Sequence, residues 1–391
     1  MGSVARDLPL PKSPYGTSLP KNHRVSGNSD KITDILAAFA KFSMKPAVDA
    51  SHTGTKLVNE PMPYASIVVP VLNEARFIAQ CLTSLLAQAP DDAFEILVMD
   101  GGSIDGTQAI VHGLQLKHRC IQLIHDSGST PAAMNLASRI ASPRATILVR
   151  ADAHALYPPD FLQKCLRALA ETGATSVVVP LRAIGAHGVQ KAIAAVLNSP
   201  LGNGGSPHHA RGPSRFVDEA HHAAFSREFF ASLGGYNENF TNNEDSEYDT
   251  RATRAGGRAW FCNEAAVTYF PRHSLSSLGR QYFSYGHGRA HTLFTLRARP
   301  RLRQLAPIAI VAGCVGGLGL MLVHPSFGLV PLAYVTTCTT WGMRAALRAR
   351  EPWLIGMGVA AMIMHFAWAL GFLSFAIGFR RIRVLRAAGR F

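Results

Sequence analysis

The chain has 391 residues, of which 48% are hydrophobic and only 16% are charged, and its formal net charge is +14. This balance is unusual for a soluble protein, so membrane segments are expected. Residues 272–391 carry the whole excess, with fifteen Arg, one Glu and neither Lys nor Asp, while residues 1–271 are neutral. Arginine beside apolar segments is typical of membrane proteins, with anionic lipid headgroups as partners, and a nucleic-acid partner is not expected.

The N-terminal segment, residues 1–60, is predicted to be disordered except for one amphipathic helix at 31–44. The apolar face of that helix could lie on a membrane or dock on the body of the protein. The first thirty residues lack an apolar core of the kind found in secretory signals, so no such signal is expected. The six cysteines show no CxxC pairing, which favours reduced thiols over a disulfide framework or a zinc site.

From residue 64 short apolar strands alternate with helices, which is typical of βαβ units. Because the strands are almost continuously apolar, we expect an α/β, Rossmann-like, mostly parallel sheet covered on both faces. Such sheets bind ligands beyond the carboxyl ends of their strands. The pattern places this domain at residues 61–300, with strands at 65–71, 94–100, 120–126 and 145–152 and helices at 74–88, 106–117 and 130–141.

Three uncharged runs lie in the last region, residues 301–391, at 305–323, 325–343 and 353–379, and each is long enough to cross a bilayer. With the globular part in the cytoplasm, two crossings return the arginines of "RAALRAR" (344–350) to the inside, as the positive-inside rule requires. A third crossing would place the tail "RRIRVLRAAGR" outside, against that rule. The third run either crosses or turns back as a re-entrant hairpin, or the first two runs do not span fully.

"VMDGGSIDGT" (98–107) ends a predicted strand with Asp100, continues through Gly-Gly and opens a helix at Thr107. The glycines permit a tight turn and a close ligand approach, Asp100 can accept hydrogen bonds from a base or ribose, and the helix start favours anions. A plain strand–turn–helix junction capped by Asp is the alternative. The stretch matches neither the phosphate loop of NTPases nor the dinucleotide fingerprint of dehydrogenases.

"RADAHALYPPDF" (150–161) places Asp152 and His154 two residues apart, so both side chains share one face of an extended segment. A carboxylate and an imidazole can hold a divalent cation whose other ligands are diphosphate oxygens and water. Such a cation would neutralise charge on a departing nucleoside diphosphate. Alternatively, Asp152 caps the next segment and His154 only bonds a neighbour.

"NNEDSEYDTR" (242–251) contains four carboxylates in six residues, at Glu244, Asp245, Glu247 and Asp249. Acidic residues favour the first turn of a helix, so a solvated helix start is one reading. The other is that one carboxylate acts as a general base toward a sugar hydroxyl.

"RQYFSYGHGRAHT" (280–292) carries Arg280, His287 and Arg289 just before the apolar runs. These side chains suit a diphosphate or an anionic lipid headgroup, and a basic membrane-proximal flank is the alternative. The histidine pairs at 208–209 and 221–222 are assigned to loops or to the acceptor side, because adjacent strand residues point to opposite faces.

In this order, the motifs resemble those of the family-2 inverting glycosyltransferases, which have the glycosyltransferase-A fold, over about residues 65–292. "SIVVPVLNE" resembles the opening strand and loop of the family, "VMDGGSIDGT" its nucleotide-binding turn, and "PAAMNLA" the helix that carries its Asn. "RADAHALYPPDF" and "NNEDSEYDTR" stand where its metal-binding and Glu-Asp base motifs fall. "DAHALYPPDF", "NEDSEYDTRATRAGGRAW" and "YGHGRAHT" are most similar to the ExoA-type β-glucosyltransferases of succinoglycan biosynthesis.

The resemblance implies a role for each matching residue. Asp245, with Glu244, would supply the catalytic base, Asp152 and His154 would hold Mn or Mg, and Arg280, His287 and Arg289 would meet the acceptor or the diphosphate. The nucleotide-sugar would contact Pro70, Asn73, Glu74, Asp100, Gly101, Ser103, Asp105, Asn135 and Asp152. His154 replaces the second Asp of the usual metal motif, and an imidazole tilts the preference from Mg toward Mn.

The implied protein is a multi-pass glycosyltransferase of the inner cell membrane with a cytoplasmic catalytic domain. It would add one sugar, with glucose and a β-linkage expected, from a UDP-sugar to a lipid-linked or polysaccharide-precursor acceptor, beside other polysaccharide-assembly proteins. The Q-x-x-R-W motif of processive members is absent, so a single addition is expected. The alternatives are an inactive membrane-bound glycan-assembly partner that retains the fold, or another nucleotide-sugar-using transferase. A nucleotidyltransferase would carry a Gly-rich loop after its first strand, which "VPVLNEARF" lacks.

Overall fold

The computed structural model describes residues 64–88, 93–125, 127–205, 212–218 and 221–387, with side chains as far as residue 378. The chain divides into two units, 1–60 and 61–391, and all described residues belong to the second. The helix predicted at 31–44 therefore lies outside the described residues.

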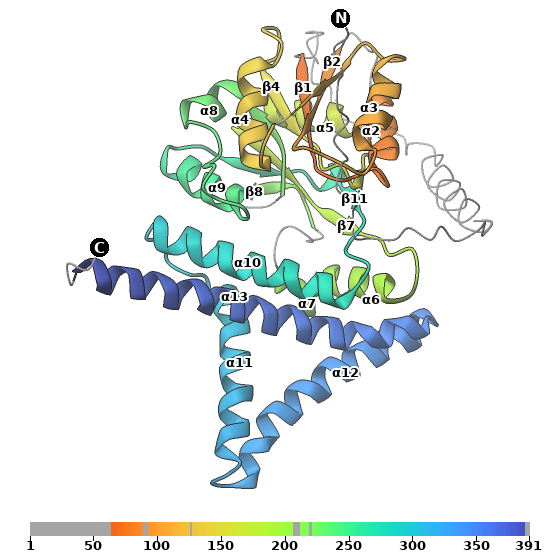
Figure 1. The fold of residues 1–391 in the computed structure, drawn as a ribbon. Helices are drawn as coiled ribbons and strands as arrows, with labels where there is room; N and C mark the ends of the chain where they lie inside the picture. Colours follow the sequence, from red (N-terminus) through yellow and green to blue (C-terminus); the bar gives the residue numbers. More distant parts are fainter. Residues whose placement is uncertain (1–63, 89–92, 126, 206–211, 219–220, 388–391) are drawn as a thin grey trace, which may run out of the picture. The chain divides into compact units, whose positions relative to one another are not determined.

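The described residues form an eight-stranded sheet in the order β3-β2-β1-β4-β9-β6-β10-β8 (Figure 1). The first four strands are parallel, β9 is antiparallel to both of its neighbours, β10 is parallel to β6, and β8 is antiparallel to β10. The expected mostly parallel α/β sheet is confirmed. Its strands are β1 (Ala65–Val71), β2 (Phe94–Asp100), β3 (Ile121–Ile124), β4 (Ile147–Arg150), β6 (Ser176–Val179), β8 (Arg215–Val217), β9 (His221–Ser226) and β10 (Ala259–Phe261).

Helices cover both faces of this sheet, which explains why the central strands are almost continuously apolar, with Ser66 and Glu95 as buried polar exceptions. In β1, Ile67 and Val69 pack on one face with α2, α3 and α5, while Val68 packs on the other with α4, α8 and α9. Successive side chains of a strand point to opposite faces, so a strand covered on both sides needs an unbroken apolar run. The helices are α2 (Ile78–Leu86), α3 (Thr107–Gln115), α4 (Thr130–Ile140), α5 (Phe161–Thr172), α8 (Arg227–Ser232) and α9 (Glu244–Arg254).

A small three-stranded sheet and two further helices lie between the main sheet and the C-terminal helices. The small sheet has the order β5-β11-β7 and places Tyr269 beside the segment after β4. A 3-10 turn, η2 (Asn263–Ala265), precedes β11. The elements are β5 (Ala155–Leu156), β7 (Leu181–Ala183), β11 (Val267–Tyr269), α6 (Gly188–Leu197) and α7 (Pro200–Asn203).

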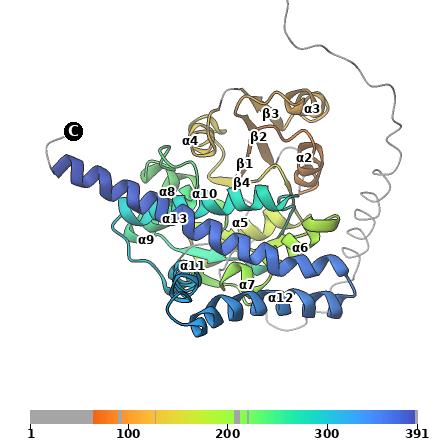
Figure 2. The same ribbon diagram turned by 60° about the horizontal axis from the view of Figure 1, so that its bottom comes forward.

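The C-terminal part is built from four long helices, and the last of them lies alongside the first and runs in the same direction (Figures 1 and 2). Between them, α11 and α12 form a hairpin that projects away from the sheet (Figure 1). By length and composition, Leu302–Leu320 and Pro352–Gly378 are apolar enough to cross a membrane among the described residues. The elements are α10 (Leu275–Thr295), α11 (Leu302–Leu320), η3 (Pro325–Gly328), α12 (Leu329–Ala349), η4 (Pro352–Ile355) and α13 (Gly356–Ala387).

Two glycines set the close approach of α10 and α13. A Cβ atom added at Gly286 of α10 would come within 3.0 Å of the Trp368 carbonyl oxygen, and one at Gly371 of α13 would meet the Phe283 carbonyl oxygen equally closely. Real Cβ atoms essentially never lie so near backbone atoms, so the two helices could not keep this spacing with larger residues.

Gly371→Ala should therefore lower the apparent melting temperature of the detergent-solubilised protein. Overpacking costs about 1–3 kcal/mol, whereas Ala at an open helix position is favourable. Gly316→Ala on α11 is the matched control, since nothing lies within 4 Å of its added Cβ. Equal shifts in the two variants would contradict the packing argument.

Candidate active site

The candidate site forms at the edge of the sheet where β2, β1 and β4 end. Val71 of β1 pairs with Asp100 of β2, and Val68 pairs with Arg150 of β4. Because parallel strands bring their carboxyl ends to one edge, Asp100 and Asp152 lie on either side of β1.

The loops after β1 and β2 are joined by hydrogen bonds. The Asn73 N–H donates to Ser103 Oγ at 2.8 Å, the Ile104 N–H donates to Asn73 Oδ1 at 2.9 Å, and the Ala75 N–H donates to Asp105 Oδ2 at 3.0 Å. Asn73 has a φ of 57°, a conformation that Asn tolerates better than most residues. These polar residues therefore order the rim of the site.

Asp100 is fully buried and shapes the turn that follows it. Its Oδ2 accepts hydrogen bonds from the N–H groups of Gly102 and Ser103, both at 3.0 Å, and from Gln108 Nε2 at 2.7 Å. Burial favours the neutral acid, but the bonds from Ser103, Gln108 and Gly102 hold the pKa of Asp100 below its usual value. A contact between Asp100 and a base or ribose stays a prediction.

Gly101 and Asn135 both fix neighbouring loops. A Cβ at Gly101 would lie 2.8 Å from the Gly128 carbonyl oxygen, so only glycine fits. The Asn135 amide donates to the Tyr236 carbonyl at 2.8 Å and accepts from the Tyr236 N–H at 2.8 Å. Neither residue lines the cavity described next, and their predicted contact with a nucleotide is not tested by this geometry.

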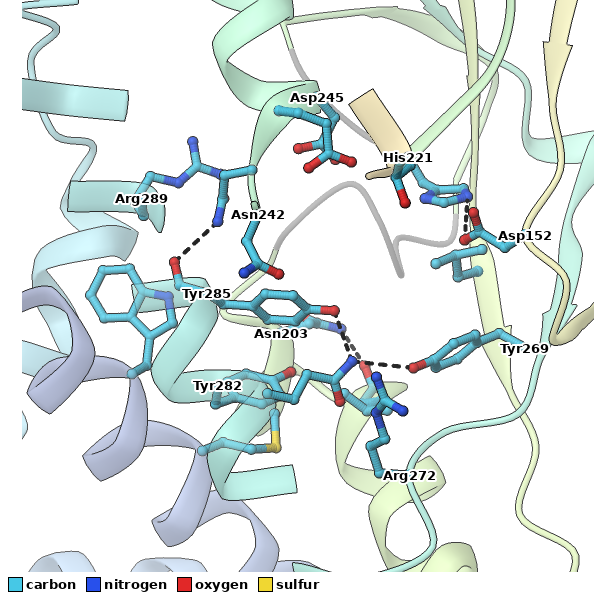
Figure 3. Close-up of a pocket in the computed structure, with 18 of the residues that line it drawn as sticks. Asp152, Asn203, His221, Asn242, Asp245, Tyr269, Arg272, Tyr282, Tyr285 and Arg289 are labelled. Carbon is cyan, nitrogen blue, oxygen red and sulfur yellow. Dashed lines mark hydrogen bonds and ion pairs between the residues drawn. The ribbon is translucent and has the colours of Figure 1, made fainter. Parts of the chain in front are cut away.

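A cavity of about 810 Å³ opens at this edge of the sheet (Figure 3). The strand side contributes Pro70 and Glu74, and α9 contributes Glu244 and Asp245. The opposite wall comes from α10, α11 and α13. The lining residues used below are Pro70, Glu74, Arg150, Asp152, His154, His221, Glu244, Asp245, Tyr269, Arg272, Tyr282, Tyr285, Arg289, Arg303, Pro307, Ile310, Met364 and Trp368.

Arg150 connects the end of β4 to the start of α9. Its Nε lies 3.4 Å from Asp152 Oδ1, and its Nη1 lies 3.1 Å from Glu244 Oε1. Burial alone would lower the pKa of Arg150, but Asp152, Tyr236 and Glu244 raise it, so the guanidinium stays charged. Burial raises the pKa of Glu244 even though Arg150 opposes this, with the neighbouring Asp245 adding to the rise. The cation thus binds the two sides of the cavity together.

Asp152 is surrounded by cationic or protonatable groups. Besides Arg150, His221 Nε2 of β9 lies 3.5 Å from Asp152 Oδ2 (Figure 3). Burial favours the neutral acid, yet Arg150, His221 and His154 together hold the pKa of Asp152 well below its usual range. Asp152 is therefore an anion that faces the cavity.

His154 is held by Glu74 from the loop after β1, because its Nδ1 lies 3.0 Å from Glu74 Oε1. Burial would lower the pKa of His154, but the bond to Glu74 and the charge of Asp152 raise it. A carboxylate partner at Nδ1 favours the tautomer in which Nε2 of the neutral ring keeps its lone pair.

The structure separates the four carboxylates of the 242–251 motif by their partners. Glu244 and Asp245 line the cavity, and the Asp245 carboxylate points into it (Figure 3). Glu247 is buried against Arg251 at 2.7 Å, and Asp249 is buried against His222 at 2.7 Å. Glu247 and Asp249 are therefore structural here.

Of the three basic residues predicted on α10, Arg289 lines the cavity and donates to Ser246 Oγ of α9. Arg280 is exposed outside the lining. His287 lies against the ring of Phe375 in α13, with 5.0 Å between ring centroids. A role for Arg280 or His287 toward the acceptor stays a prediction.

Several lining residues have no counterpart among the predicted site residues. Arg150 could have been identified from the sequence, because a charged residue at the end of an apolar strand, close to Asp152, needs a buried partner. The assignment of the histidines at 221–222 to a loop is wrong, because both lie in β9. Their side chains take opposite faces of that strand, His221 toward Asp152 and His222 toward Asp249. The further lining residues that sequence reasoning did not single out are Tyr269, Arg272, Tyr282, Tyr285 and Arg303.

Known proteins match this chain in both sequence and fold. A family model described as "Glycosyl transferase family 2" matches residues 66–234. The succinoglycan biosynthesis protein ExoA of Rhizobium meliloti (strain 1021) is 38% identical over 317 residues, which cover 81% of this chain and 96% of that protein. The chain belongs to glycosyltransferase family 2. The predicted membership in this family and the similarity to ExoA are confirmed, and the protein is a glycosyltransferase.

Two more distant comparisons cover most of the chain. A dolichyl N-acetyl-α-D-glucosaminyl phosphate 3-β-D-2,3-diacetamido-2,3-dideoxy-β-D-glucuronosyltransferase of Methanococcus voltae is 22% identical, over 80% of this chain and 97% of that protein. The solved mannosyltransferase PcManGT from Pyrobaculum calidifontis, in complex with GDP-Man and Mn²⁺, superposes with a TM-score of 0.50 at 21% identity, covering 88% of this chain and 96% of that chain. The glycosyltransferase-A-like fold is thus confirmed.

Beneath the site, the buried His222–Asp249 pair should make stability depend on pH. Burial lowers the pKa of His222, but Asp249 raises it by a larger amount, so the pKa of His222 lies above its usual value. The stabilisation is then fully present below the unfolded value of about 6.5 and is lost as the pH rises through the folded value. His222→Gln should cost about 3–5 kcal/mol at low pH, because Asp249 loses its buried partner.

Urea unfolding of wild type and variant at pH 6 and pH 9 in the same detergent measures this effect. The gap in unfolding free energy should shrink as the pH rises. Tyr236→Phe is the control, since it removes the 2.8 Å bond to His222 Nδ1 and the bond between the hydroxyl and Arg150 but no charge, and it should keep the wild-type pH dependence. A His222→Gln gap that is equal at both pH values would contradict the charged-pair assignment.

Proposed function

We propose that this glycosyltransferase adds one sugar, glucose, in β-linkage from a UDP-sugar to a lipid-linked glycan acceptor in exopolysaccharide synthesis. One observation carries the proposal: Asp152 at the end of β4 and Asp245 in the first turn of α9 face the same cavity (Figure 3). An anion that suits a nucleotide–cation unit thus stands near a carboxylate that suits a base. The similarity to ExoA of Rhizobium meliloti supports the exopolysaccharide context.

In the proposed reaction, an acceptor hydroxyl attacks the anomeric carbon of the donor as its proton passes to Asp245. A new carbon–oxygen bond forms while the bond from the anomeric carbon to the UDP oxygen breaks, and its electron pair leaves with UDP. A single displacement of this kind inverts the configuration. Arg289 lies in the cavity near α9, where a guanidinium can stabilise the departing diphosphate.

The donor set at the end of β4 suits a divalent cation, with Mn preferred over Mg. Asp152 offers an ionised carboxylate, and His154 offers an imidazole whose Nδ1 is held by Glu74 at 3.0 Å. Metal-bound histidines commonly have such a carboxylate at their other nitrogen. When bound, the cation would supply charge neutralisation for the diphosphate. The similar mannosyltransferase of known structure holds Mn²⁺ with its nucleotide-sugar.

The acceptor wall of the cavity favours a membrane-held glycan. α11 contributes Arg303, Pro307 and Ile310, and α13 contributes Met364 and Trp368. The hydroxyl to be glycosylated would therefore sit beside helices from the apolar C-terminal region. We place residues 61–300 as the catalytic domain in the cytoplasm and 301–391 as the region that holds it at the inner membrane.

Asp245→Asn should abolish sugar transfer while leaving UDP binding within about twofold, because the amide cannot take the hydroxyl proton. Transfer is measured as UDP release from UDP-glucose with Mn²⁺ and a lipid extract, and binding by calorimetry. Asp160→Asn is the control, because this half-exposed carboxylate precedes α5, pairs with Lys164 and does not line the cavity. Normal turnover in Asp245→Asn would remove the base assignment, and an inactive wild type would favour a silent assembly partner.

Glu74→Gln should weaken Mn²⁺ binding in the presence of UDP by about 10–100-fold, the usual cost of losing a carboxylate behind a histidine ligand. Electron paramagnetic resonance of free Mn²⁺ measures the affinity without turnover. Glu171→Gln, an exposed carboxylate on α5, is the control. Unchanged Mn²⁺ affinity in Glu74→Gln would argue against His154 as a ligand.

A further inference from the structure

The α11–α12 hairpin exposes an uncharged, largely apolar surface. No Asp, Glu, Lys or Arg occurs between Gln304 and Met343. Large apolar side chains along the hairpin and its turn are open, with Leu322 94% exposed and Leu329 63% exposed. A surface of this extent on a protein marks contact with a partner or with lipid.

The dimensions and charges of this hairpin fit a bilayer. α11 has 19 residues and α12 has 21, and their uncharged parts, 304–320 and 329–343, are about 26 and 22 Å long at 1.5 Å per residue, against a hydrocarbon thickness of about 30 Å. α12 is less apolar than α11 and α13, and it spans if the long side chains of Arg344 and Arg348 extend to the headgroups. The arginines lie only at the end that joins the rest of the protein. Arg301 and Arg303 stand at the start of α11, and Arg344, Arg348 and Arg350 at the end of α12.

α13 is not part of this hairpin and lies alongside α10 (Figures 1 and 2). The close approaches at Gly286 and Gly371 bring the backbones of the two helices together. His365 of α13 also bonds the Leu201 carbonyl of α7 through its Nε2 at 2.9 Å. α13 is therefore fixed to the catalytic unit along its first half and its middle.

α10 in turn cannot enter the hydrocarbon core, because it belongs to the catalytic site. Arg289 donates to Ser246 in α9, and Asn243 Nδ2 donates to the Tyr285 carbonyl at 3.2 Å. A Cβ at Gly288 would lie 2.7 Å from the Asn242 carbonyl oxygen, so α10 and the loop before α9 are in direct contact. A helix packed along the length of α10 must lie at the same depth relative to the bilayer as α10.

We infer that α11 and α12 cross the bilayer as a hairpin, while α13 lies along the membrane surface beside α10 and does not cross. The Arg-rich tail at 380–390 then stays on the side of the catalytic unit, next to anionic headgroups. This arrangement satisfies the positive-inside rule, which a third crossing would break. It is independent of the donor and of the reaction proposed above.

Cysteine labelling in sealed membranes tests the sidedness of the full chain. Leu116→Cys, exposed at the end of α3, reports the catalytic side, Ser326→Cys reports the hairpin turn, and Phe391→Cys reports the tail. The native cysteines at 81, 120, 165, 262, 314 and 338 are all buried, and the wild-type chain measures their background. A membrane-impermeant maleimide is applied to intact cells and to inverted vesicles.

The tail cysteine should react from the same side as Leu116→Cys, and Ser326→Cys from the opposite side. Labelling of the tail from the side of Ser326→Cys would overturn the assignment of α13. Labelling of Ser326→Cys from the catalytic side, or its protection on both sides until detergent is added, would overturn the two crossings.

Spin labels on α13 give a second measurement that does not depend on sidedness. Val359, Leu370 and Ile377 are exposed, and their spacings of eleven and seven residues place them on one helix face. In vesicles of phosphatidylethanolamine and phosphatidylglycerol, accessibility to oxygen and to a nickel chelate gives the depth of each label. A surface helix should place all three within a few Å in depth, whereas a crossing helix would separate the end labels by about 27 Å and refute the inference.

Discussion

The arrangement of the site depends on the two ion pairs that the Arg150 guanidinium makes. It joins Asp152, two residues away at the strand end, to Glu244, 94 residues later in α9. Removing a cation from water is costly unless anions compensate, so the largely buried Arg150, with a side chain 12% exposed, requires both carboxylates nearby. The same requirement brings Asp245, the neighbour of Glu244, over the end of β4. The separation between the end of β4 and the first turn of α9 is thus set by one ion-pair cluster.

The first half of the sheet could be predicted from the sequence, because each of its strands is marked by an apolar run of its own. β1 and β2 are buried on both faces, so their nearly continuous apolar runs mark them at the right boundaries. β9 escaped this reasoning, since its place between β4 and β6 depends on pairing with distant strands. Its insertion brings His221 to Asp152, a contact that no spacing along the chain could indicate. The alternation of faces was predictable, and the identity of the partners was not.

The 242–251 motif shows the same limit in more detail. Four carboxylates within six residues look equivalent in sequence, yet each acquires its character from a tertiary partner. Arg251 neutralises Glu247 one helical turn away, an i,i+4 pair that sequence could suggest. His222, from β9, takes Asp249 into the core. Only after these two are assigned do Glu244 and Asp245 remain as the carboxylates that face the cavity.

α10 connects the chemistry to the C-terminal helices, because one of its faces meets α9 through Arg289 while another accepts α13 at Gly286. If α13 lies on the membrane surface, this contact sets the height of the cavity above the bilayer. Arg303 and Trp368 then line the catalytic cavity at the level of the headgroups. An acceptor anchored by its lipid would need no extraction from the membrane to reach Asp245. Gly286 and Gly371, which look like weak points in two helices, would then position the proposed base, Asp245, relative to the lipid surface.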